Sequence, residues 1–74
     1  MDEKELKALL IKENEEFGKV YKEHQHCEKK LEELKNKGFL TEQESLEEKD
    51  LKKKKLFLKD RMYSLMDEYR KSRS

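Results

Sequence analysis

The residues best suited to chemistry in this 74-residue sequence are His24, His26 and Cys27, which stand within four positions. In a helix His24 and Cys27 would share one face, whereas His26 would point about 160° away from His24. A structural zinc site needs four ligands, and a cysteine nucleophile needs an oriented base beside it. We therefore expect no metal, no cofactor and no enzymatic activity. Cys27 is expected to be a small buried hydrophobe, and His24 a histidine between packed helices.

Four consecutive lysines, Lys52, Lys53, Lys54 and Lys55, are the second group with chemical potential. On a helix they would spread over every face, and the acidic residues at positions 47, 48, 50 and 60 dilute their charge. We expect a solvated helix surface with ion pairs. The alternative is a weak contact with nucleic-acid phosphates, which would depend steeply on salt concentration.

The composition limits the classes of protein that could carry these histidine, cysteine and lysine side chains. Half of the residues are charged, the formal net charge is +1, and only 32% are hydrophobic. A large enzyme core is excluded because too little apolar surface exists to bury, and no apolar stretch is long enough to span a bilayer. The small net charge disfavours broad electrostatic capture of nucleic acid. The acidic N-terminus and the single cysteine indicate a cytoplasmic protein.

Apolar residues recur at heptad spacing in both halves of the chain. Such spacing is typical of helices that pack along one seam, and glutamate, lysine and leucine are strong helix formers. Each half contains two rows. They are formed by Leu10, Phe17, His24 and Leu31, by Leu6, Val20, Cys27 and Leu34, by Leu51, Leu58 and Leu65, and by Met62 and Tyr69.

A helix stop and a helix start follow each other in the middle of the sequence. Gly38 can adopt the left-handed conformation that ends a helix, and Thr41 with Glu44 matches a capping box. We predict one helix near residues 3–36, a turn near 37–41 and a second helix near 42–71, within a single domain. The fold class is all-α, an antiparallel two-helix hairpin in which facing residue numbers sum to about 79. Gly18 would be a tolerated small residue or a close helix contact.

One hairpin is too thin to shield all of its apolar side chains. Leu56, Phe57, Tyr63 and Met66 broaden the apolar face of the second helix beyond what one neighbour covers, and small scaffolds often need self-association. We expect a homodimer or other homo-oligomer, such as a four-helix bundle, or a complex with another protein. The candidate packing and interface residues are Leu10, Phe17, Val20, Tyr21, His24, Cys27, Leu31, Leu51, Leu56, Leu58, Met62, Leu65 and Tyr69.

Two segments of the sequence point to a known family. They are Glu13-Asn14 with Phe17, Tyr21 and His24, and Leu51-Lys52-Lys53 with Leu56, Leu58-Lys59-Asp60, Met62, Tyr63 and Leu65. Over residues 5–67 the chain resembles the YdcH-like family of small bacterial proteins of uncharacterised function. The resemblance implies a long antiparallel helical hairpin and brings no established activity or cofactor. The chain departs from the family at Cys27, where members often have leucine, and in the turn, where many relatives have proline.

Overall fold

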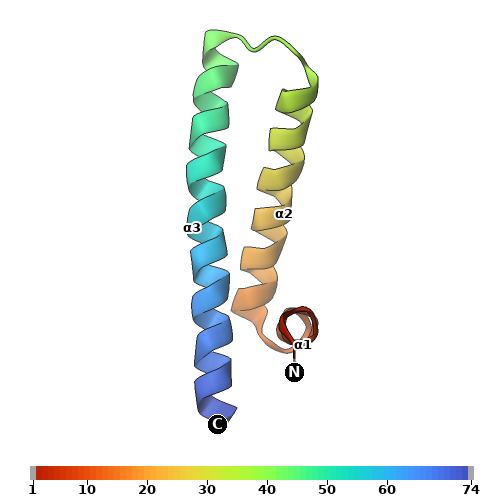
Figure 1. The fold of residues 1–74 in the computed structure, drawn as a ribbon, viewed down its shortest axis with the longest axis vertical. Coiled ribbons are helices and arrows are strands. Elements are labelled where there is room, and N and C mark those ends of the chain that lie inside the picture. Colours follow the sequence, from red (N-terminus) through yellow and green to blue (C-terminus); the bar gives the residue numbers. More distant parts are fainter. Residues whose placement is uncertain (1, 74) are drawn as a thin grey trace.

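The computed structural model describes residues 2–73, and three helices account for most of them. α1 spans Glu3–Glu13, α2 spans Glu15–Asn36 and α3 spans Glu42–Arg73. α2 and α3 lie side by side and run in opposite directions, whereas α1 is seen almost end-on beside the end of the pair farthest from the turn (Figure 1). No strand occurs in residues 2–73, so the predicted all-α class is confirmed there.

The first helical stretch differs from the single helix predicted over residues 3–36. Asn14 has extended backbone angles, φ −111° and ψ 110°, and separates α1 from α2. Its N–H donates to the carbonyl of Leu10 at 2.8 Å and so closes the last turn of α1. Its side-chain Oδ1 accepts from the N–H of Phe17 at 3.0 Å and so caps the start of α2. Asparagine is favoured at this capping position, and the break lets the chain change direction.

α1 therefore lies across α2 and α3 instead of extending α2. A Cβ atom on Gly18 would lie 3.3 Å from the Ile11 carbonyl oxygen, so the small glycine permits a close approach of α1 and α2. The Tyr63 hydroxyl donates to Glu3 Oε1 at 3.1 Å, and Lys7 Nζ lies 5.8 Å from the centre of the Tyr63 ring. The Tyr63 hydrogen bond, with help from Lys7, lowers the pKa of Glu3. These contacts hold α1 against both long helices.

The main core forms where the three helices meet. α1 contributes two fully buried leucines, α2 contributes Phe17, and α3 contributes Met62, Leu65 and Met66. The sequence placed Met66 outside the main rows, yet it is fully buried. The reason is α1, which supplies a third helix to this end of the molecule. The buried leucines of α1 are Leu6 and Leu10.

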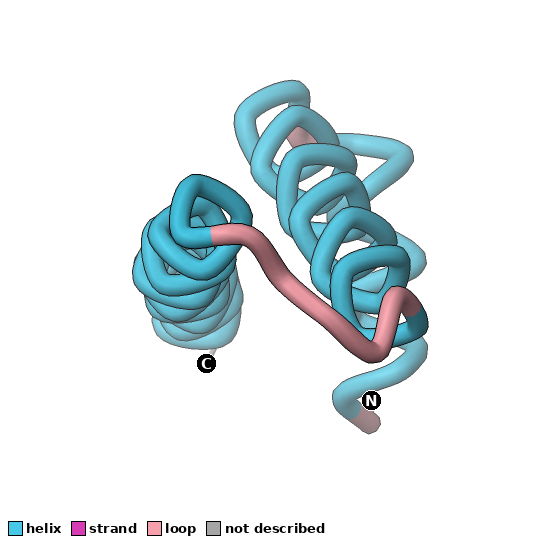
Figure 2. The backbone as a smooth tube through the Cα atoms, turned by 90° about the horizontal axis from the view of Figure 1, so that it is seen from above, coloured by secondary structure: helices cyan, strands magenta, loops and turns pink. Residues whose placement is uncertain are grey.

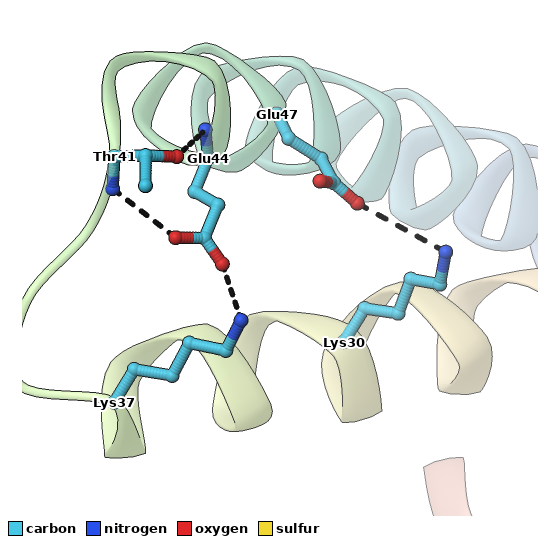
Figure 3. Close-up of polar contacts among 5 residues, drawn as sticks. All are labelled: Lys30, Lys37, Thr41, Glu44 and Glu47. Atoms are coloured by element: carbon cyan, nitrogen blue, oxygen red, sulfur yellow. Dashed lines mark hydrogen bonds and ion pairs between the residues drawn. The ribbon is translucent and has the colours of Figure 1, made fainter.

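The connection between α2 and α3 follows the predicted stop and start. Figure 2 shows it as the loop that crosses from the end of α2 to the beginning of α3. Gly38 has a φ of 75°, the left-handed conformation expected of it. Thr41 Oγ1 accepts from the N–H of Glu44, and Glu44 Oε1 accepts from the N–H of Thr41, both at 3.1 Å (Figure 3). The capping box is confirmed, and Lys37, the residue that follows α2, also binds the Glu44 carboxylate.

Replacing Thr41 with alanine should lower the free energy of unfolding by about 1 kcal/mol, because the N–H of Glu44 loses its acceptor. Thr41→Ser keeps the hydroxyl and should stay close to the original protein. Urea unfolding followed by circular dichroism measures both changes. Equal stability of the alanine and serine variants would contradict the role assigned to this cap.

Candidate functional site

His24 and Cys27 lie on the packed side of α2. The His24 side chain is 12% exposed, and its Nδ1 lies 2.9 Å from Glu28 Oε1. Its Nε2 is buried and makes no hydrogen bond within the described residues. Cys27 is buried and reduced, and His26 is exposed. Residues 2–73 contain no group of three or more histidine, cysteine, aspartate or glutamate side chains arranged to hold a metal ion.

Burial is the main cause that lowers the pKa of His24. Glu28 opposes the shift, while Lys55, Lys59 and Lys7 add to it. The arrangement suits the neutral imidazole with its hydrogen on Nδ1, because that hydrogen faces the carboxylate of Glu28. The ring is thus mostly buried in the α2–α3 pair, with its Nδ1 directed at Glu28.

Stability should fall as the pH drops below the ordinary histidine value of 6.5. In that range the unfolded chain binds a proton at His24 more readily than the folded chain does, so protonation favours unfolding. The contribution of His24 is complete above pH 6.5 and is lost as the pH falls through the lower pKa of the folded state. His24→Gln should reduce this dependence, whereas His26→Gln, at an exposed position, should leave it intact. Urea unfolding on both sides of pH 6.5 tests the difference, and equal pH dependence in all three proteins would contradict it.

An open groove runs between α2 and α3 on the face where lysines gather. Three of its lysines, Lys52, Lys55 and Lys59, come from α3, and Lys29 and Lys35 come from α2. Glutamates also line it, and Lys52 pairs with one of them, Glu48, at 3.6 Å. Its apolar walls are Leu31 and Leu56, and the remaining lining residues are Gln25, Glu28 and Glu32.

The four consecutive lysines thus lie on different parts of the surface of α3. Lys52 and Lys55 line the groove, Lys53 is exposed elsewhere on α3, and Lys54 lines a hollow on another part of the helix. Lys59 was not among the predicted lysines, although its spacing of four from Lys55 places it on the same face. The two lysines of α2 could not be predicted, because only the packing of α2 against α3 brings them to the groove.

Ion pairs join α2 to α3 along the pair. Arg61 Nε donates to Glu16 Oε2 at 2.8 Å near the α1 end. Closer to the turn, Lys30 Nζ lies 3.9 Å from Glu47 Oε1 (Figure 3). These pairs are exposed and contribute little stability each.

Several large apolar side chains of α3 and the turn are exposed. Phe57 is 70% exposed, Leu46 and Leu56 are each 62% exposed, and Phe39 in the turn is 92% exposed. Leu46 borders the hollow on α3, together with Gln43, Glu47, Asp50, Leu51 and Lys54.

The predicted packing residues fall into three groups by exposure. Leu10, Phe17, Cys27, Leu58, Met62 and Leu65 are buried. The half-buried group consists of Val20, Tyr21, His24, Leu31, Leu51 and Tyr69. Leu56 alone among them is exposed, although it lines the groove between α2 and α3. Buried residues that were not among these candidates are Leu6, Leu34 and Met66.

Comparison with known proteins gives one family match. A family described as a protein of unknown function, DUF465, matches residues 17–66. This stretch begins at the buried Phe17, runs through the turn and ends at the buried Met66. No curated protein and no solved structure matches the chain. Within residues 2–73 none of the helices has the length and apolar character needed to cross a membrane.

Proposed function

From the premise that this chain belongs to the DUF465 family of proteins of unknown function, we propose that it acts through contacts with other protein chains, first of all with a second copy of itself. In this proposal it is a cytoplasmic, non-enzymatic helical protein without a cofactor that resembles the YdcH-like proteins. The family match supports no activity of its own, so the proposal depends on the surface of the molecule.

The supporting observation is the exposure of Phe57, Leu46 and Leu56 on one helix. Exposed large apolar side chains are candidates for contact with another protein, and Leu46 and Phe57 lie on one face of α3, whereas Leu56 lines the groove beside α2. All three lie on α3 outside the main core, which the helices of the same chain already fill. Another chain is therefore needed to remove them from water.

Pairing of two copies would bring four long helices together, as expected from the sequence, with the two α3 helices in contact and each α2 packed on its own α3. α1 would remain with its own copy, because its leucines are buried there by Phe17, Met62, Leu65 and Met66. The two copies would therefore associate without exchanging their α1 helices.

Sedimentation equilibrium from micromolar to millimolar concentration tests this proposal. We expect the average mass to rise from that of one chain toward that of two chains, because association depends on concentration. A mass of one chain over the whole range would contradict self-association. The melting temperature should rise over the same range, since binding to the folded state stabilises it.

A second candidate function follows from the lysine groove. The five lysines at positions 29, 35, 52, 55 and 59 outnumber the glutamates at 28, 32 and 48 that share the groove. The groove therefore has an excess of positive charge that suits the phosphates of a nucleic acid. Filter binding to mixed RNA and DNA should then show retention at low salt that disappears steeply as salt rises. Absence of retention at low salt would exclude this second candidate.

A further inference from the structure

Four exposed residues of α3 form a stripe that the core does not use. Leu46, Asp50, Lys53 and Phe57 follow one another at spacings of four, three and four, which places them on one face of a helix. We call these four residues the outer stripe. Tyr63, which contacts α1, lies about 120° around the helix from Phe57. α1 therefore covers a different face of α3 and leaves the outer stripe free.

The order of residues in the outer stripe makes it complementary to itself in the antiparallel direction. If two stripes cross between residues 51 and 52, Leu46 faces the partner's Phe57 and Asp50 faces the partner's Lys53. The same two contacts occur again on the other side of the crossing point, as a two-fold axis requires. A parallel pairing in register would instead place Asp50 against Asp50 and Lys53 against Lys53, which like charges disfavour.

We infer that two copies of this chain associate through their outer stripes, with the two α3 helices antiparallel about a two-fold axis. This inference rests on the proposed self-association and specifies its surface and direction. It commits to a second copy as the occupant, because in this register apolar residues face apolar residues and opposite charges face each other.

The hollow beside Leu46 gives the partner's Phe57 a place to pack. Leu46 and Leu51 provide its apolar lining, and Asp50 and Lys54 lie at its border. Phe57 is the most exposed of the large apolar side chains within the helices. In the antiparallel register its ring lies opposite Leu46, so each copy both supplies a ring and receives one.

The register also continues beyond the outer stripe. Gln43, which lines the hollow, would face the partner's Asp60. A glutamine amide can donate a hydrogen bond to a carboxylate, so this contact is favourable as well. The pairing therefore extends over most of the first five turns of α3.

Charge reversal tests the surface and the direction together. Asp50→Lys alone and Lys53→Asp alone each place like charges opposite each other twice per dimer. Each variant should weaken dimerisation about tenfold, because two attractive exposed pairs per dimer are replaced by two pairs of like charge. An equimolar mixture of the two variants should restore dimerisation, because the two lysines of one chain then face the two aspartates of the other. The double variant should restore it within one chain type.

Lys52→Asp provides the matched control, because it makes the same change of charge one residue away. Lys52 lines the groove on a different face of α3. It should leave the original dimer unchanged, and it should not rescue Asp50→Lys in a mixture. Circular dichroism of each variant at low concentration verifies that the helices form.

The outcomes distinguish the inference from the proposal on which it rests. If the original protein dimerises but neither the single variants nor their mixture change the dissociation constant, the outer stripe is the wrong surface and self-association stands. If Lys52→Asp rescues Asp50→Lys as well as Lys53→Asp does, general charge attraction explains the mixture and the register is wrong. If the original protein stays a single chain at millimolar concentration, both the inference and the proposal of self-association are overturned.

Discussion

Replacing Phe17 with alanine should destabilise the protein by about 3–5 kcal/mol, the cost of removing a large aromatic side chain from a packed core. Phe17 is completely buried at the point where the three helices meet. It is also the first fully buried residue after the cap at Asn14, which accepts a hydrogen bond from its N–H. The loss should exceed that of any surface substitution and approach the total stability of a small domain.

Phe57→Ala is the matched control, since it removes the same side chain from a position that is 70% exposed. At a concentration where the protein is a single chain, its stability should change by no more than about 0.5 kcal/mol. Urea unfolding of the two variants and the original protein measures both effects. A loss below about 1 kcal/mol for Phe17→Ala would mean that the ring is not enclosed by the three helices.

Replacing Leu6 with alanine should cost about 2–5 kcal/mol, because α1 is held to the other helices mainly by its buried leucines. Leu6 is 2% exposed and packs in the same cluster as Phe17 and Met66. Its truncation would leave a cavity between α1 and the two long helices. The change therefore measures how strongly α1 is attached.

Ile11→Ala serves as the control on the same helix, at a position that is 38% exposed. Its effect should be clearly smaller than that of Leu6→Ala. Amide hydrogen exchange adds a local measurement, because loss of α1 packing should speed exchange in residues 3–13 before it affects α3. Equal stability of the two variants would contradict the packing of α1 described above.

The heptad rows predicted most of the packing between the long helices. Phe17, Cys27, Leu58, Met62 and Leu65 were all expected at packed positions, and all are buried. Apolar residues repeat at heptad spacing on the face of a helix that packs against another helix. The spacing alone therefore identifies that buried face. The capping box at Thr41 was predictable for a similar reason, since its two hydrogen bonds are local.

The break at Asn14 was not predicted, although the sequence holds a signal for it. Asparagine followed by Glu15 and Glu16 is typical of a helix start, but asparagine is also tolerated within helices. Tertiary packing decides whether the helix continues through Asn14 or is interrupted there. By leaving the axis of α2, α1 buries Leu6 and Leu10 against Met66. The burial of Met66 depends on this position of α1. Heptad rows on two helices alone could not predict it.

The candidate surfaces were predictable only in part. Leu56 and Phe57 were recognised as apolar residues beyond the main rows, and both are exposed. The groove with five lysines depends on which faces of α2 and α3 meet, so its α2 side required the packed structure. The outer stripe was predictable from the sequence. Its four residues follow the spacing of one helix face, with an aspartate and a lysine between Leu46 and Phe57.

Filtered nuclear Overhauser spectroscopy on a mixture of isotopically labelled and unlabelled chains tests the pairing of two copies most directly. Leu46 and Phe57 of one chain lie about 16 Å apart along the helix, too far for a cross-peak within the chain. Cross-peaks between the Phe57 ring of one chain and the Leu46 methyl groups of the other are the predicted result. A spectrum without any cross-peaks between chains at millimolar concentration would contradict the account.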